Sequence, residues 1–146
     1  MKYIISTLLI LATLFSCSDD FDNVTLEMTT VAKGNNFPYD DNEAPIENIV
    51  ITNSIHWNNI KTKIEPNELL EDNIDFNMYT VIAVIDEVQT SGGYDVEIES
   101  VVEHEDEVIV ESEFEDGGDG AVTAVLTRPY HFIKVEKIDK TVEFSN

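Results

Sequence analysis

Acid–base and nucleophilic side chains are plentiful in this sequence, but none stands in the spacing of a familiar enzyme site. The chain has 30 acidic residues and three histidines, His56, His104 and His131. It lacks the serine-hydrolase, zinc-protease and phosphate-loop motifs. Among so many carboxylates two always lie close together, so no general acid–base pair can be selected. We predict a protein that is not an enzyme. His104 and His131 fall in expected strands and could meet across a sheet, but we interpret all three histidines as ordinary structural or surface residues.

The single cysteine, Cys17, is placed for covalent modification, since no second cysteine is present for a disulfide. It follows an uncharged apolar run over residues 4–15. A membrane span needs about 20 such residues, so this shorter run is typical of a secretory signal. Leu-Phe-Ser-Cys at 14–17 resembles a bacterial lipobox, in which the leader is cut before the cysteine and the cysteine is acylated; Phe15 is bulkier than usual there. We predict a lipoprotein signal peptide over residues 1–16 and a palmitate-bearing lipid anchor on Cys17.

The residues after Cys17 bear on localisation. Ser-Asp-Asp-Phe-Asp at 18–22 is an acidic cluster that resembles the surface-export signal of Bacteroidota lipoproteins. We therefore expect a protein anchored in the outer membrane by its lipid. Of the periplasmic face and the cell surface, the acidic cluster favours the surface.

A loop over residues 115–120 offers oxygen ligands for calcium. Asp116 and Asp119, together with Glu113 or Glu115, could supply some of the ligands that calcium takes around a tight turn. The full twelve-residue calcium loop is absent, so the alternative is a solvated acidic turn. We predict no dedicated metal site and no cofactor.

The composition excludes some classes of partner. The formal net charge is −22, and cleavage before Cys17 would remove Lys2 and no acid, giving about −23. Because a nucleic-acid binder must neutralise phosphate with basic side chains, we predict no nucleic-acid partner. The acidic residues either form a solvated face or steer a basic partner. Roughly 130 residues remain after cleavage, which is enough for one domain.

Three consecutive strands are expected over residues 78–114. Residues 78–85 form a β-branched apolar run without alternation, which predicts a central strand covered on both faces. Tyr94, Val96, Ile98 and Val102 then alternate with acidic residues, and a similar alternation follows over residues 108–115. These two strands are expected to form an acidic hairpin with one face in water.

The segments before this region are expected to be simpler. We interpret residues 17–48 as an acidic tether with one possible short strand near residues 24–28, and residues 49–146 as the folded domain. Asn53 or Ser54 can cap a helix over about residues 55–64, ended by Pro66. The spacing predicts one buried stripe on this helix, made of three side chains: Trp57, Ile60 and Ile64.

The C-terminal part is expected to complete the sheet. Pro129 cannot donate to a strand ladder, so it belongs at a strand start or a bulge. We expect Lys134, Lys137 and Lys140 to lie beside the acidic hairpin and to relieve its charge repulsion. The expected fold is a single β-rich α+β domain, a twisted antiparallel sheet of sandwich or half-barrel type with one packed helix.

Two short stretches could contact a partner. Thr90, Ser91, Gly92, Gly93 and Tyr94 form a turn whose glycines leave open backbone beside an aromatic ring, and Pro129-Tyr130 offers a rigid aromatic. Tyrosines favour interfaces because they contribute large areas at small entropic cost. The alternative is that both tyrosines pack in the core and the glycines only make the turn.

These stretches carry a resemblance to a known family. Thr-Ser-Gly-Gly-Tyr at 90–94, the acidic hairpin, and Leu-Thr-Arg-Pro-Tyr at 126–130 together resemble the C-terminal domain of the PrcB family, over about residues 49–144. The sequence departs from the family in the loop before residue 121, where Asp-Gly-Gly-Asp-Gly replaces a proline-containing segment.

The resemblance implies a lipid-anchored, non-catalytic subunit that binds a surface protease or another envelope protein. A second interpretation is a protease inhibitor, because the Gly-Gly-Tyr turn resembles the Gly-Tyr loops of chagasin-like inhibitors. A third is a module that binds calcium or a small ligand.

Overall fold

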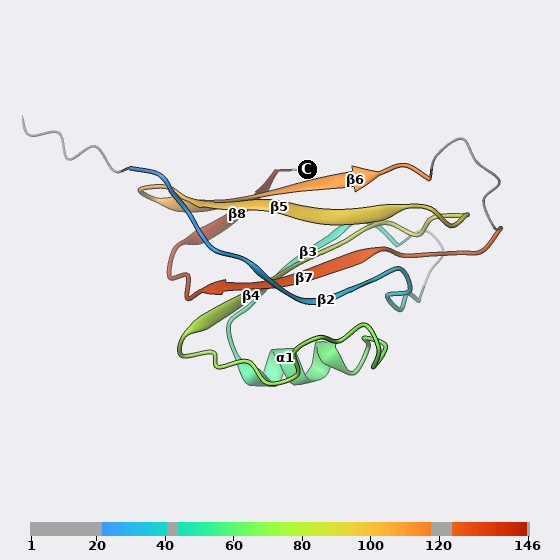
Figure 1. Ribbon diagram of the computed structural model, residues 1–146, viewed down its shortest axis with the longest axis horizontal. Coiled ribbons are helices and arrows are strands. Elements are labelled where there is room, and N and C mark those ends of the chain that lie inside the picture. The colour runs from blue at the N-terminus through green and yellow to red at the C-terminus, as the bar shows by residue number, and fades with distance from the viewer. Residues whose placement is uncertain (1–21, 41–43, 118–123, 146) are drawn as a thin grey trace, which may run out of the picture.

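Two four-stranded sheets lie face to face, and one helix covers the outer face of the second sheet (Figure 1). The computed structural model describes residues 22–40, 44–117 and 124–145. Its elements are β1 (Val24–Thr25), β2 (Thr29–Gly34), β3 (Glu47–Ile51), α1 (Ser54–Lys61), β4 (Tyr79–Ile85), β5 (Asp95–Glu103), β6 (Glu107–Glu115), β7 (Tyr130–Glu136) and β8 (Thr141–Ser145). The strand order is β1-β5-β6-β8 in the first sheet and β2-β7-β4-β3 in the second.

The predicted fold class, β-rich α+β with one packed helix, is confirmed. Both sheets are open, and neither closes into a barrel. One pairing was not expected: β8 lies parallel to β6, while the other neighbouring strands are antiparallel. The two sheets and the helix enclose two separate hydrophobic cores.

Strand β4 is the central strand that the apolar run predicted. Its neighbours are β7 and β3. Val81, Ala83 and Ile85 face the helix side, and Ile82 and Val84 face the first sheet. Because successive side chains alternate between the faces of a strand, each core takes one half of β4. A continuous apolar run is therefore required here.

The acidic hairpin β5–β6 is also present, with one inward and one exposed face. A bulge between Ile98 and Ser100 interrupts the pairing of the two strands. Because a bulge adds one residue, the alternation reverses beyond it. Val101 is therefore fully buried and Val102 only partly, whereas the simple alternation predicted Val102 as the inward residue.

The N-terminal segment belongs to the fold more closely than the sequence indicated. Residues 24–25 pair with β5, and β2 forms an edge of the second sheet against β7. Val31, Ala32 and Phe37 are buried in the core beneath the helix. Within the stretch interpreted as a tether, the structure thus shows two strands where one was expected. The pairing of β2 depends on a strand that lies about a hundred residues away, so no local pattern reveals it.

Helix α1 has the predicted cap and the predicted stripe. The Asn53 side chain accepts a hydrogen bond from the backbone N–H of His56 at 2.9 Å. Trp57, Ile60 and Ile64 are all buried, as expected. The helix ends at Lys61, earlier than expected, so Ile64 lies just after it. Among the residues that the structure describes, no helix is long and apolar enough to span a membrane.

Lys134, Lys137 and Lys140 were expected to lie beside the acidic hairpin and relieve its charge repulsion, and this is wrong for two of the three. Lys134 Nζ binds the Glu71 carboxylate at 2.6 and 2.7 Å, and Lys137 Nζ donates to a backbone carbonyl at 3.4 Å. Only Lys140 reaches the acidic hairpin, where it pairs with Glu103 at 2.8 Å. The reason is that β7 lies in the sheet opposite the hairpin.

Gly34, at the end of β2, is predicted to be sensitive to a single added methyl group. An added Cβ would collide with the carboxylate of Glu68, which accepts a hydrogen bond from the hydroxyl of the buried Tyr130. Moving Glu68 would leave the Tyr130 hydroxyl without its partner, so we expect Gly34→Ala to lower the free energy of unfolding by about 1–2 kcal/mol. Urea unfolding measures this change.

A double-mutant cycle with Tyr130→Phe checks the cause. If the loss in Gly34→Ala arises through the hydroxyl, adding Tyr130→Phe to it costs almost nothing further. Additive losses in the double variant would mean that Gly34 matters for another reason.

Candidate binding site at the three-loop end

Three chain segments meet at one end of the sandwich: residues 86–94 after β4, residues 115–117 at the end of β6, and residues 124–129 before β7 (Figure 1). We call this the three-loop end. The backbones of Gln89 and Thr127 exchange two hydrogen bonds, at 2.8 and 3.0 Å. The Thr127 hydroxyl also donates to the carbonyl of Ser91 at 2.9 Å. Two of the sequence stretches singled out above are thus joined directly.

Glycine is required at two positions of this end. Gly93 has a positive φ of 96°, and an added Cβ would lie 2.8 Å from the Gly117 carbonyl oxygen. A Cβ on Gly117 would in turn lie 2.9 Å from the ring of Tyr94. Gly92 has no such constraint, since the nearest atom to its Cβ position belongs to Val125 at 4.0 Å. The first and second loops therefore approach each other through glycine backbone.

The predicted contact residues separate into a surface group and a buried pair. Thr90 and Gly93 are exposed, and Ser91, Gly92 and Tyr94 are partly buried. Pro129 and Tyr130 are buried instead. The structure brings the first five together at the three-loop end and places the last two beneath it.

Tyr130 packs in the core, which is the alternative that the sequence analysis left open. Its ring packs edge-on against Phe37 and Phe132, with centroids 5.4 and 5.7 Å apart. Burial and the hydrogen bond to Glu68 raise the pKa of the Tyr130 hydroxyl far above its ordinary value, so the group stays neutral at physiological pH.

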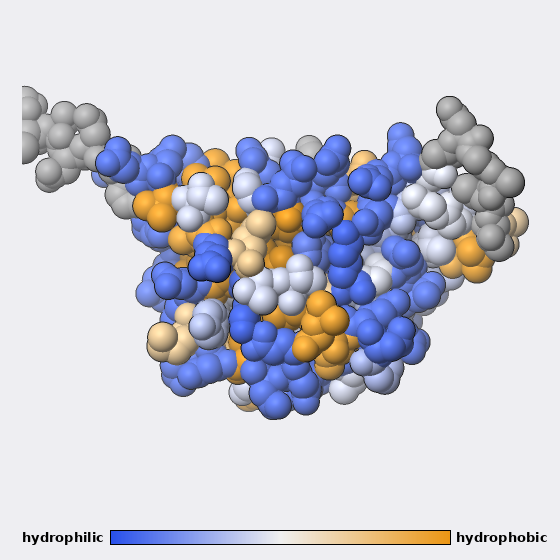
Figure 2. Space-filling model, viewed as in Figure 1, coloured by the Kyte–Doolittle hydropathy of each residue, from blue (hydrophilic) through white to orange (hydrophobic). Residues whose placement is uncertain are grey.

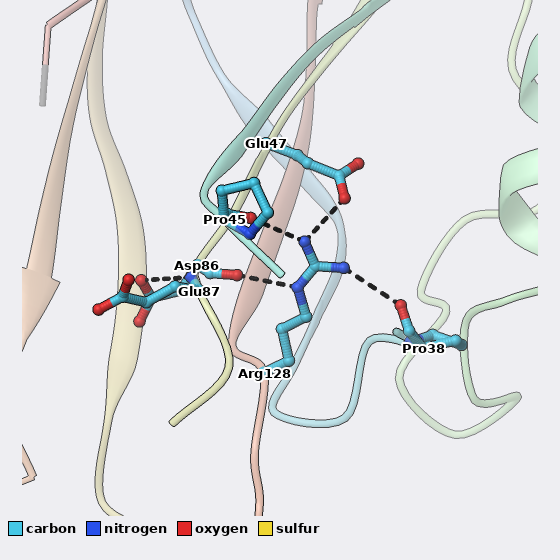
Figure 3. Close-up of polar contacts among 6 residues, drawn as sticks. All are labelled: Pro38, Pro45, Glu47, Asp86, Glu87 and Arg128. Atoms are coloured by element: carbon cyan, nitrogen blue, oxygen red, sulfur yellow. Dashed lines mark hydrogen bonds and ion pairs between the residues drawn. The ribbon is translucent and has the colours of Figure 1, made fainter. Parts of the chain in front are cut away.

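Arg128 organises this end and was missed by the sequence analysis. Its guanidinium is nearly inaccessible and donates to four acceptors on three stretches of chain (Figure 3). These are the carbonyls of Asp86 at 3.0 Å, Pro38 at 3.2 Å and Pro45 at 2.9 Å, and the carboxylate of Glu47 at 2.7 Å. It is the one arginine in the sequence and lies within the Leu-Thr-Arg-Pro-Tyr stretch at 126–130, between Thr127 and Pro129. These two facts together are the signal that could have identified it.

Asp86 shapes the start of the first loop. Its carboxylate accepts hydrogen bonds from the Glu87 backbone N–H at 2.7 Å and from the Gln89 side chain at 3.0 Å. Burial raises the pKa of Asp86, and the Gln89 bond opposes that effect. These contacts fix the loop that leads to the Gly-Gly-Tyr turn.

The third loop exposes two large apolar side chains. Val125 and Leu126 are 47% and 40% exposed. Figure 2 shows hydrophobic surface at its right-hand end, where Figure 1 shows the described segment that leads into β7. The neighbouring Glu115 and Asp116 are exposed as well. The three-loop end therefore combines apolar side chains, open glycine backbone and an acidic border.

A pocket of about 300 Å³ adjoins the Arg128 cluster. Phe37, Tyr39, Lys63 and Arg128 contribute to its wall. The Arg128 guanidinium is already bonded to protein acceptors. The most buried cation in the pocket wall therefore has little free hydrogen-bonding capacity for a ligand.

The described residues contain no group of three or more histidine, cysteine, aspartate or glutamate side chains placed to hold a metal ion. Of the calcium candidates, Asp116 is exposed, while Asp119 lies outside the described residues. Cys17, the predicted lipidation site, also lies outside them.

The histidines do not form a site together. His56 is exposed on α1. His104 lies in the β5–β6 turn, where its N–H bonds to the Glu107 carbonyl at 2.8 Å. His131 is buried in β7 and bonds to Thr30 and to the backbone of Ile98. The expectation that His104 and His131 could meet across a sheet is wrong, because His104 lies in the turn that joins two strands of the first sheet and His131 lies on β7 of the second.

Comparison with protein families gives one match. Residues 80–136, from β4 to β7, match the family model described as PrcB C-terminal. This range contains all three segments of the three-loop end. It is shorter than the range of about residues 49–144 over which the sequence analysis expected the resemblance. Comparison with curated proteins and with solved structures gave no significant match.

Proposed function

We propose that the chain, whose residues 80–136 match the family model described as PrcB C-terminal, is a non-catalytic accessory subunit of a protease complex that binds its partner through the three-loop end. The observation that carries the proposal is the joining of the Gly-Gly-Tyr turn to the Thr127–Arg128 stretch by backbone hydrogen bonds. Both stretches carry the resemblance to the family. Their union at one exposed end favours a shared binding role.

The surface chemistry of this end suits a protein partner. Contiguous exposed apolar surface can mark an interaction site, and the adjacent Val125 and Leu126 supply exposed apolar side chains here. At Gly92, where the nearest atom to the Cβ position belongs to Val125 at 4.0 Å, the open backbone lets a partner approach closely. The buried Arg128 cluster holds the surrounding loops in place, which lowers the entropic cost of binding.

The same residues give little support to catalysis. The three segments of this end contain carboxylates and hydroxyl groups but no histidine, cysteine or lysine. One hydroxyl, that of Thr127, is already committed to the Ser91 carbonyl. A nucleophile with an adjacent general base is therefore not provided by these segments.

We further propose that Cys17 carries a lipid that holds the protein in the outer membrane, with the cell surface favoured over the periplasmic face. The lipobox-like sequence and the acidic cluster after it support this anchor. Replacing Cys17 with alanine should move the protein from the membrane fraction to the soluble fraction. Unchanged membrane fractionation would contradict the anchor.

Chemical crosslinking of intact membranes, followed by capture of the full chain and identification of what is attached, tests the protease-complex role. The proposal expects a protease among the crosslinked partners. Recovery of envelope proteins of other kinds only, with the natural chain folded and anchored, would contradict it.

The arrangement of the loops also favours a second candidate, a protease inhibitor. Loops gathered at one end of a β-sandwich can present a continuous binding surface, as residues 86–94, 115–117 and 124–129 do here. An inhibitor would reduce the activity of the captured protease in a direct assay. An accessory subunit would leave that activity unchanged or raise it.

A further inference from the structure

His131 occupies a position of β7 where the pattern of the sheet calls for an apolar side chain. It pairs with Val84 of β4 and with Lys33 of β2, and it points between the two sheets. The next inward residue on β7, Ile133, belongs to the inter-sheet core. His131 is only 2% exposed, so its polar ring atoms need partners inside the protein.

Both ring nitrogens have such partners, and the partners fix the tautomer. The backbone N–H of Ile98 donates to Nδ1 at 3.0 Å. Because an amide N–H can only donate, Nδ1 carries no proton and Nε2 carries it. The Nε2–H then donates to the Thr30 hydroxyl at 2.9 Å. One neutral imidazole thus links β5 of the first sheet to β7 and β2 of the second.

The need for this link follows from the edge of the first sheet. Strand β1 pairs with β5 at Val102 and Glu103, and the Leu26 N–H beyond it bonds to the Val101 carbonyl at 2.8 Å. Among the residues that the structure describes, no strand lies beside the start of β5 on that side. The Ile98 N–H lies next to the bulge in β5. The imidazole therefore takes the place of a neighbouring strand as its hydrogen-bond acceptor.

Charged groups surround the ring from two elements. Lys33 of β2 pairs with Asp95 at 2.8 Å and with Glu97 at 3.2 Å, both on β5. Burial lowers the pKa of His131 below its ordinary value, and the positive charge of Lys33 lowers it further, while Glu97 and Asp95 oppose this shift. From β4, the paired residue is the uncharged Val84. The hydrogen bond from Ile98 and the lowered pKa both favour the neutral ring at neutral pH.

We propose that the hydrogen bonds of His131 to Ile98 and Thr30, here called the clasp, hold the start of β5 against the second sheet and are released by acid. The clasp thereby also holds the end of the first loop of the three-loop end, which leads into β5. Protonation of Nδ1 would set two donors, Nδ1–H and the Ile98 N–H, against each other. The link between the sheets would then open at β5. The proposal concerns regulation of the three-loop end and stands whether or not the partner is a protease.

The direction of the pH dependence follows from proton binding. The unfolded chain takes up a proton on this histidine near its ordinary pKa of about 6.5, whereas the folded protein does so only at lower pH. The hydrogen bonds of His131 therefore contribute their full stability above the ordinary pKa of about 6.5. This contribution is lost as the pH falls from there through the lower pKa of the folded protein. Over the affected range the unfolding constant should rise by up to about tenfold per pH unit from this group alone.

Denaturant unfolding of the full chain at pH 7.5 and pH 5.5 tests the clasp, with His131→Gln as the variant. Glutamine can accept from Ile98 and donate to Thr30 but does not titrate. His56→Gln, an exposed histidine on α1, is the matched control. We expect the natural chain and the His56 variant to lose stability on acidification by the same factor, and the His131 variant to lose clearly less. Equal losses in all three would overturn the proposal.

Nitrogen NMR of the natural chain provides a second readout that needs no variant. At pH 7.5 the Nδ1 resonance of His131 should show the unprotonated form, and the Ile98 amide should be protected from exchange. On acidification the amide should lose protection at the same pH at which Nδ1 becomes protonated. An Nδ1–H tautomer at pH 7.5, or protection of Ile98 that persists after protonation, would contradict the clasp.

Discussion

Replacement of Arg128 by methionine is expected to lower the free energy of unfolding by about 3 kcal/mol. Methionine fills a similar volume but leaves the carbonyls of Pro38, Pro45 and Asp86 and the carboxylate of Glu47 without their donor. Unpaired polar groups in a buried site are costly. Glu47 is 46% exposed and can turn to water, which keeps the expected loss at the lower end of that for a broken buried ion pair. Urea unfolding at neutral pH measures the change.

Lys63→Met is the matched control for Arg128. Both cations lie over the ring of Phe37, at 6.0 Å for Lys63 and 5.8 Å for Arg128. Lys63 is exposed, so its replacement should change stability by no more than about 0.5 kcal/mol. If the two variants behaved alike, the four hydrogen bonds of Arg128 would not be what holds the loops together.

Gly93→Ala is expected to lower the free energy of unfolding by about 2 kcal/mol and to reduce partner binding. The alanine would have to keep a φ of 96° and would push against the Gly117 carbonyl. The contact between the first two loops must therefore open. Unfolding in urea and recovery of the crosslinked partner measure the two effects.

Gly92→Ala separates backbone strain from mere size. Its added Cβ would have only Val125 nearby, at 4.0 Å, and Gly92 does not need a positive φ. We expect a change within about 0.5 kcal/mol, with a gain possible because alanine restricts the unfolded chain. Similar losses for the two glycines would show that the conformation of Gly93 does not define the loop.

Local patterns predicted the parts of the fold that depend on local sequence. The continuous apolar run of β4, the cap of α1 and the Trp57–Ile60 spacing each follow from the geometry of one element. The bulge in β5 could not be predicted, because nothing in the alternation shows where the extra residue lies, and Val101 took the inward position expected for Val102. The pairing of β2 with β7 likewise needs contacts between distant segments.

The candidate site was predicted in part for the same reason. The Gly-Gly-Tyr turn stood out because paired glycines are a local signal. The role of Arg128 was not visible, since its acceptors come from residues 38, 45, 47 and 86, which only the fold brings together. Tyr130 was considered for the surface, but it packs in the core against Phe132 on β7 and against Phe37, which lies in the segment that was assigned to the tether.

The central claim is that the three-loop end contacts the partner, and site-specific photo-crosslinking in intact membranes tests it most directly. A photoreactive residue would replace Thr90 or Val125 at the three-loop end, or Ile55 on α1 as the control, because all three are exposed. The proposal expects the same protease to be crosslinked from positions 90 and 125 and not from position 55. Crosslinking from position 55 alone, by a chain that still recovers the protease chemically, would place the interface on the helix side and contradict the claim.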